Sequence, residues 1–149
     1  MSTAPFAPAA QNPAIVEACN RALDGLRAQS RSFQVASFAT DDGFEITRRP
    51  VSADQDQRLA SMASSLQALT EAVAHDRRLG TTQYSLVEAE MGRVLLRRVP
   101  GQPIMLLAVF GTEEQSGIAV TLSRVILNEL GTELARLSPE RRDPTHIQR

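Results

Sequence analysis

Few side chains in this 149-residue sequence are of the types that carry out acid–base or nucleophilic chemistry. There is one cysteine, Cys19, and there are two histidines, His75 and His146. A catalytic nucleophile needs an adjacent base, and a zinc site needs several His, Cys or carboxylate ligands at short spacings. None of the three residues has such neighbours in the sequence. We therefore predict that the protein is not an enzyme and binds no metal and no cofactor.

Each of these residues has a simpler structural explanation. Cys19 repeats with apolar residues at helical spacing, which favours a buried position over an exposed, reactive one. A single cysteine excludes an intrachain disulfide and is typical of a cytoplasmic protein. His75 lies near the predicted end of a helix, where a solvated cation is favourable, and His146 lies in a polar tail. Asp41 and Asp42 precede Gly43, as in many hairpin turns, so we assign them to a turn and not to a carboxylate pair.

The basic residues give no sign of a phosphate-binding or nucleic-acid-binding site. All sixteen are Arg, so the chain lacks the lysine of a phosphate-binding P-loop and is not itself a GTPase of that type. The formal net charge is -1 and the aromatic content is 4%, which leaves neither a basic stripe nor a stacking platform for bases. Neighbours on a strand point to opposite faces of a sheet. Of the four adjacent pairs, Arg48/Arg49, Arg77/Arg78, Arg97/Arg98 and Arg141/Arg142, those on predicted strands are therefore divided between the two faces.

The sequence predicts three helices, with two strands between the first and second and three strands between the second and third. Asn12 followed by Pro13 is typical of a helix start, and apolar spacing continues that helix to about Ala28. Two β-prone runs then flank the Asp42 and Gly43 turn. Ser52 and Gln55 match the capping box of a second helix, and Gly80 favours a left-handed cap after it. Three strands follow at 83–88, 93–99 and 104–110, and a last helix spans 117–137 with Ile118, Leu122, Ile126, Leu130 and Leu134 on its apolar face.

Length and composition favour a single domain. The hydrophobic content of 42% suffices for one core. We place the domain at residues 12–137, between a flexible Ala- and Pro-rich arm at 1–11 and a polar tail at 138–149. The sequence has no secretory signal and no membrane-spanning run. The strand at 104–110 is apolar almost throughout, which predicts a central strand covered on both faces.

The predicted middle helix ends near Arg77 and Arg78, and its stretch at 58–73, RLASMASSLQALTEAV, has two largely uncharged sides. Helical spacing predicts one side for the core: Leu59, Met62, Ala63, Leu66, Leu69 and Val73. The opposite side carries Ala60, Ser61, Ser64, Ser65, Ala68 and Ala72. Small side chains let two helices approach closely, so we predict that this side is a dimer or partner interface. Two alternatives stay open: a second contact inside the protomer, and plain exposure of Ala and Ser.

Four segments in order, FATDDGFEITRR, RLASMASSLQALTEAV, SLVEAEMGRVLLRRV and PIMLLAVFGTEEQSGIAV, resemble the Roadblock/dynein light chain family over about residues 15–137. The resemblance implies an α/β (α+β) domain in the order α-β-β-α-β-β-β-α, with a five-stranded antiparallel sheet between helices. It also implies a dimer formed through the middle helix and a sheet edge.

The resemblance to bacterial members implies a non-enzymatic homodimeric regulator or scaffold of a small Ras-like GTPase. An effect on GTP hydrolysis needs no catalytic residue here, and the sequence identifies no arginine finger: Arg48, Arg58 and Arg97 are all conceivable, and no feature singles one out. The alternatives are a signalling-complex adaptor without effect on the nucleotide cycle and a small-molecule sensor domain.

Overall fold

The computed structural model describes residues 12–51 and 57–137. Its helices are α2 (Pro13–Gln29), α3 (Gln57–Asp76) and α4 (Ser116–Leu137). Its strands are β1 (Phe33–Thr40), β2 (Glu45–Arg49), β3 (Ser85–Ala89), β4 (Gly92–Arg98) and β5 (Ile104–Phe110).

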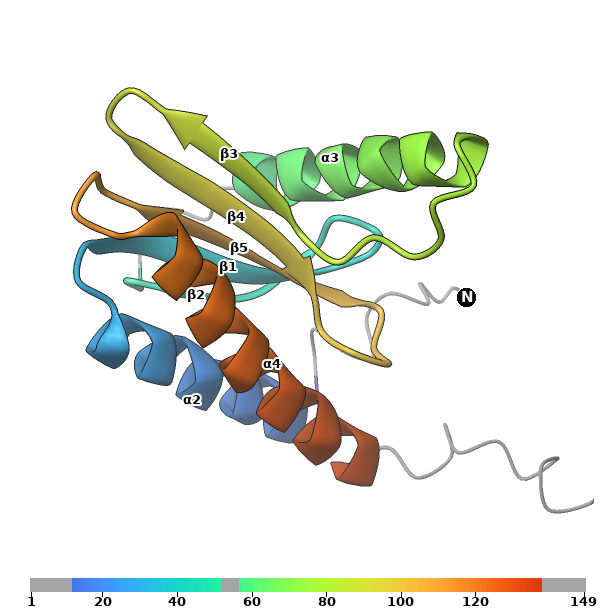
Figure 1. Cartoon of the computed structure of the whole chain (residues 1–149). Helices are drawn as coiled ribbons and strands as arrows, with labels where there is room; N and C mark the ends of the chain where they lie inside the picture. The colour runs from blue at the N-terminus through green and yellow to red at the C-terminus, as the bar shows by residue number, and fades with distance from the viewer. Residues whose placement is uncertain (1–11, 52–56, 138–149) are drawn as a thin grey trace, which may run out of the picture.

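The strands form one antiparallel sheet in the order β2-β1-β5-β4-β3, which leaves β2 and β3 as its edges. Helices α2 and α4 cover one face of the sheet, and α3 lies on the other (Figure 1). This confirms the predicted fold class, the order of elements and the meander of the last three strands. No helix among residues 12–51 and 57–137 is long and apolar enough to cross a bilayer.

Helix α2 begins and packs as its sequence predicts. The Asn12 side chain accepts hydrogen bonds from the backbone N–H groups of Ala14 and Ile15, at 2.9 and 3.4 Å. Cys19 has no exposed surface, and burial raises the pKa of its thiol to about 12. This thiol is therefore a core side chain, protonated and unreactive at neutral pH.

The β1–β2 hairpin places a tight turn against α3. Gly43 occupies the left-handed region with φ 90°, and a Cβ at this position would lie 3.6 Å from the Cβ of Ser64 on α3. The predicted Asp-Gly turn is confirmed, and it also positions the hairpin under the helix on that face.

Strand β5 occupies the centre of the sheet, and six of its seven residues are buried, which confirms the expected central strand. The main core lies between the sheet and helices α2 and α4. A second, smaller core lies between the sheet and α3 and consists of Ala63, Leu96, Met105 and Leu107. Two unequal cores therefore lie on the two faces of one sheet.

Helix α4 is rotated from the predicted orientation. Leu130 and Leu134 are buried as expected, but Ile118 is 47% exposed. The buried stripe also includes the small residues Ala119, Ser123 and Gly131. A Cβ at Gly131 would lie 2.8 Å from the carbonyl oxygen of Pro100, so this glycine permits a close approach that apolar periodicity does not reveal.

The end of α3 corrects another prediction. Arg78, not Gly80, is the residue in the left-handed region that follows the last turn, since Leu79 N–H donates to Ala74 C=O at 2.8 Å across it. Gly80 also has positive φ but lies beyond this cap. The predicted capping box at Ser52 and Gln55, the arm at 1–11 and the tail at 138–149 lie outside the described residues.

Candidate functional site

Helix α3 rests on the sheet through small side chains. Ala60, Ala63 and Ala74 are buried beneath it, together with the longer Gln67. The large side chains in this contact come from the sheet: Leu96, Met105 and Leu107. Small helix residues and large strand residues thus bring the helix close to the strands.

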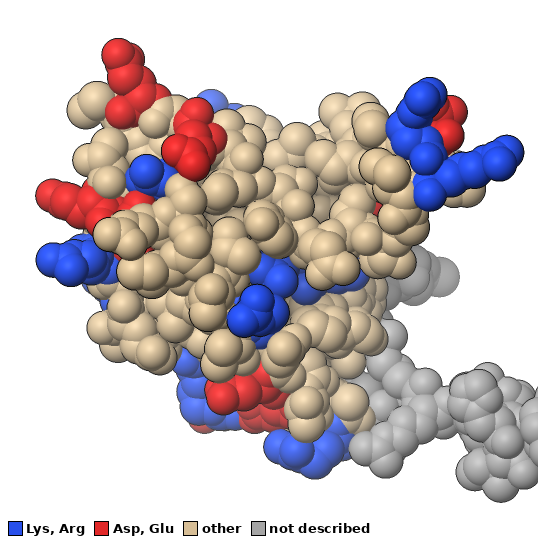
Figure 2. Space-filling view, viewed as in Figure 1, with Lys and Arg blue, Asp and Glu red and all other residues tan. Residues whose placement is uncertain are grey.

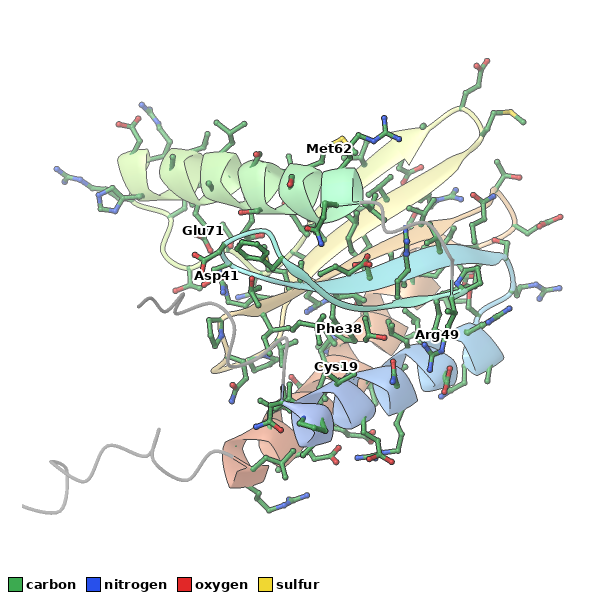
Figure 3. All side chains as sticks on the ribbon, turned by 180° about the vertical axis from the view of Figure 1, so that it is seen from behind. Cys19, Phe38, Asp41, Arg49, Met62 and Glu71 are labelled. Carbon is green, nitrogen blue, oxygen red and sulfur yellow. The ribbon has the colours of Figure 1, made fainter. Side chains whose placement is uncertain are left out.

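The large apolar side chains of α3 point away from the protein. Met62, Leu69 and Val73 are 59%, 66% and 60% exposed. Figure 3 shows Met62 on the side of the helix that faces away from the sheet. The prediction that these three residues belong to the core is wrong. Apolar spacing identifies a face that avoids water, but it does not identify what covers that face.

The six predicted interface residues divide into two groups. Ala60 is 1% exposed and faces the sheet, and half-buried Ser64 donates through Oγ to the carbonyl of Asp41 at 2.8 Å. Burial under the helix corrects the prediction for Ala60, whereas Ser64 makes a contact inside the protomer and remains accessible in part. The other four are all exposed: Ser61, Ser65, Ala68 and Ala72.

The exposed residues of both predicted sides together form one uncharged surface. We call this surface the outer face of α3, and it consists of Ser61, Met62, Ser65, Ala68, Leu69, Ala72 and Val73. The molecular surface in the corresponding part of Figure 2 carries little charge between the ends of the helix. A contiguous exposed apolar surface on a globular domain is typical of a protein interface.

An open sheet edge lies on the same side of the molecule. Strand β3 is an edge of the sheet and pairs only with β4 among the described residues. Val87, at its middle, lies opposite Val94, which packs into the α3 core, so Val87 shares the α3 side of the sheet. Val87 is 46% exposed. An edge strand of this kind offers unpaired backbone groups to another chain.

A polar network holds α3 in this position. Arg98 donates to Asp41 in the hairpin turn at 2.7 Å and to Glu71 on α3 at 3.2 Å. Gln67 also donates to Glu71, at 2.7 Å. Figure 3 shows Asp41 and Glu71 near one another between the helix and the hairpin. Three elements distant in sequence are therefore joined through one guanidinium.

This network surrounds a cleft of about 160 Å³. Small-molecule sites in proteins usually have volumes of about 300–1,000 Å³. The polar side chains of the cleft are also engaged with one another. The cleft is therefore small, and its polar side chains already bond to one another. It gives no support at this position to the alternative of a small-molecule sensor domain.

The network makes a testable prediction for acid stability. Hydrogen bonds from Gln67 and Arg98 lower the pKa of Glu71 below its ordinary value of 4.5. A lowered pKa stabilises the folded state above that value, and the contribution disappears as the pH falls through the folded pKa. We expect the Tm difference between the wild type and E71Q to be largest at neutral pH and to shrink below about pH 4.5.

Thermal melts from pH 7 to pH 3 measure this difference. E129Q is the matched control, because Glu129 is an exposed carboxylate on α4 without a hydrogen-bonded partner in the described part of the chain. An E71Q difference that stays constant across the range would contradict the assignment.

The three candidate arginine fingers differ in accessibility. Arg97 is 9% exposed and donates to the carbonyl of Val120 and the hydroxyl of Ser123 on α4. The side chain of Arg48 is 11% exposed and lies 3.6 Å from Glu45. Arg58 is exposed near the start of α3. Only Arg58 of these three has a side chain at the surface. Within residues 12–51 and 57–137 no group of His, Cys, Asp and Glu is arranged to hold a metal ion.

Comparison with known proteins agrees with this architecture. The family model for the Roadblock/LC7 domain matches residues 22–110. A Roadblock/LC7 domain from Streptomyces avermitilis superposes with a TM-score of 0.68 at 17% identity and covers 74% of this chain and 92% of its own. No curated protein sequence gives a match.

Two further solved structures share the fold. The gliding protein MglB from Thermus thermophilus has a TM-score of 0.67 at 15% identity, with 89% of this chain and 92% of its own covered. MglB from Myxococcus xanthus has a TM-score of 0.65 at 15% identity, with 87% and 98% covered. Identities this low establish a common fold. Because the family model spans more than half of the sequence, the protein belongs to the Roadblock/LC7 domain family.

Proposed function

We propose that this protein is a non-enzymatic homodimer that regulates or scaffolds a small Ras-like GTPase. The observation that carries the proposal is the outer face of α3, where Met62, Leu69 and Val73 are exposed beside the open β3 edge. A second copy that covers both features would remove apolar surface from water and pair free backbone groups. In a two-fold dimer the same patch serves both partners, so one such surface suffices.

The family resemblance supports a GTPase as the further partner. In this proposal catalysis belongs to the GTPase, and the dimer acts by holding or repositioning the GTPase's own loops. We also propose that the protein is located in the cytoplasm and that its domain spans residues 12–137.

The test mixes the purified protein with the small GTPase encoded nearest to its gene. We expect association that differs between the GDP-bound and GTP-bound forms, or a changed rate of GTP turnover, measured by calorimetry and by phosphate release. Association without a change in turnover would assign the adaptor role instead. Absence of association in both nucleotide states would contradict the GTPase proposal.

A matched variant connects this test to the structure. R58A removes the one candidate arginine finger of the three that lies at the surface. If the dimer stimulates hydrolysis by an inserted arginine, R58A lowers turnover by about 10³-fold or more. If the dimer acts by repositioning the GTPase, R58A leaves most of the stimulation intact.

A further inference from the structure

A buried guanidinium on the α4 side of the sheet has no counter-charge among residues 12–51 and 57–137. Arg97 is 9% exposed, and its described hydrogen bonds go to the uncharged Val120 carbonyl at 3.2 Å and the Ser123 hydroxyl at 3.3 Å. Its guanidinium carbon lies 5.1 Å from the ring centre of Tyr84. Within the described residues no carboxylate contacts it. Buried charges in proteins are normally paired, so this position requires an explanation.

A second cation increases the imbalance. Burial, together with the charge of Arg124 on α4, lowers the pKa of Arg97. Arg124 is exposed and forms no ion pair within the described part of the chain. We call Arg97 and Arg124 the basic pair. Figure 2 shows basic side chains gathered in the middle of this face, between the sheet and α4. Two cations that have no acidic partner in the described part of the chain favour an anionic group beside them.

The acidic residues of this face lie at the other end of the same edge strand. Tyr84 stacks on Arg97, and Glu88 accepts from Ser116 on α4 at 2.8 Å, so both lie on the α4 side of the sheet. Glu90 follows in the turn between β3 and β4 and has no bonded partner in the described residues. Figure 2 shows acidic side chains around this turn. The edge of β3 therefore runs from a basic end to an acidic end.

Antiparallel pairing of this edge with its own copy brings opposite charges together. Directly opposed residues in an antiparallel ladder lie on the same face of the sheet. Suppose that strand Ser85–Ala89 pairs over its full length with the same strand of a second copy. The two-fold axis then passes through Val87, and Ser85 lies opposite Ala89 of the second copy. The next pair outward is Tyr84 with Glu90 of the second copy. Glu88 is already held by Arg93 and Ser116, whereas Glu90 is available.

We propose that Glu90 of a second copy, placed opposite Tyr84 by pairing of the two β3 edges, is the missing counter-charge of the basic pair. The inference rests on the proposed homodimer and adds its register and a residue that each copy contributes to the other. The contact occurs twice, once on each side of the axis. A shift of the register by one residue would turn Glu90 to the opposite face and leave Arg97 unpaired.

Charge reversal tests the contact through dimer dissociation constants from sedimentation velocity. We expect E90R to raise the dissociation constant about tenfold or more, because a cation at position 90 would face both members of the basic pair at each of the two contacts. R124E should raise it less, since Arg97 still attracts Glu90. The double variant E90R/R124E restores an opposite-charge pair between positions 90 and 124, although position 90 still faces Arg97, and should therefore dimerise more tightly than E90R alone. E129R, which makes the same charge change on the α2 side of α4, should leave the constant unchanged.

Each outcome separates this inference from the proposed dimer. A wild type that stays monomeric at every concentration overturns both. A wild-type dimer that is insensitive to E90R and R124E overturns the counter-charge and leaves the dimer standing, as does a double variant that recovers nothing. The salt dependence of the dissociation constant is a further test that needs no charge-reversal variant. A higher salt concentration should weaken the wild-type dimer more than the E90Q dimer.

Discussion

Substitution of Leu69 by arginine is expected to dissociate the proposed homodimer. Leu69 is 66% exposed at the centre of the outer face of α3. Covering a leucine side chain is worth about 2 kcal/mol, and an unpaired arginine at the same place would be buried at a further cost. The change occurs twice in a symmetric dimer. We therefore expect L69R to weaken the dimer by about a hundredfold or more, which is about 2.7 kcal/mol.

Sedimentation velocity of L69R against wild type measures this loss. V125R is the matched control, because Val125 is also an exposed apolar helix residue, 47% exposed, but lies on α4. Both variants should keep the wild-type far-UV circular dichroism, since neither residue belongs to the core. A dimer equally stable in L69R and wild type would show that the outer face of α3 is not the interface.

Among the substitutions considered for their effect on folding, removal of the Glu114 carboxylate is expected to lower the free energy of unfolding most. Glu114 is 1% exposed, and its Oε1 accepts from Ser30 Oγ at 2.7 Å, Arg31 N–H at 2.7 Å and Ser32 N–H at 3.0 Å. These bonds connect the α2–β1 loop to the start of α4. Hydrogen bonds to a buried charge contribute about 1.5–3 kcal/mol each, and donors left without an acceptor carry a desolvation cost.

E114A should therefore lower the free energy of unfolding by about 3 kcal/mol and the Tm by about 10 °C. E114Q keeps an acceptor oxygen without the charge and should lose about half as much. The neighbouring E113A removes an exposed carboxylate and should change stability by about 0.5 kcal/mol or less. Differential scanning calorimetry of the three variants measures these Tm changes. An E114A Tm within about 2 °C of the wild-type Tm would contradict the stabilising role of the Glu114 carboxylate.

The sequence predicted the backbone well because its signals there are local. The Asn12 cap, the Asp-Gly hairpin turn and the apolar run of β5 depend on nearby residues and on burial from both faces. The prediction that Arg97 and Arg98 would diverge is also confirmed, since Arg97 bonds to α4 and Arg98 to α3. These elements follow from steric rules that operate within a few residues.

The orientation of α3 was not predictable in the same way. Met62, Leu69 and Val73 have the spacing of a core stripe, yet Ala60 and Ala63 face the sheet. The large residues of β4 and β5 already fill that space, so the helix needs small side chains there. Glu114 and the Arg98 network gave no sequence signal, because their partners are 27 to 84 residues away. Tertiary packing decides such contacts.

The native molecular mass in solution tests the central claim most directly. Static light scattering over a wide range of protein concentration should give twice the chain mass, because the outer face of α3 and the β3 edge are covered by a second copy. A mass of one chain at every concentration would mean that Met62, Leu69 and Val73 remain open to water. That result would contradict the dimer and the GTPase platform that depends on it.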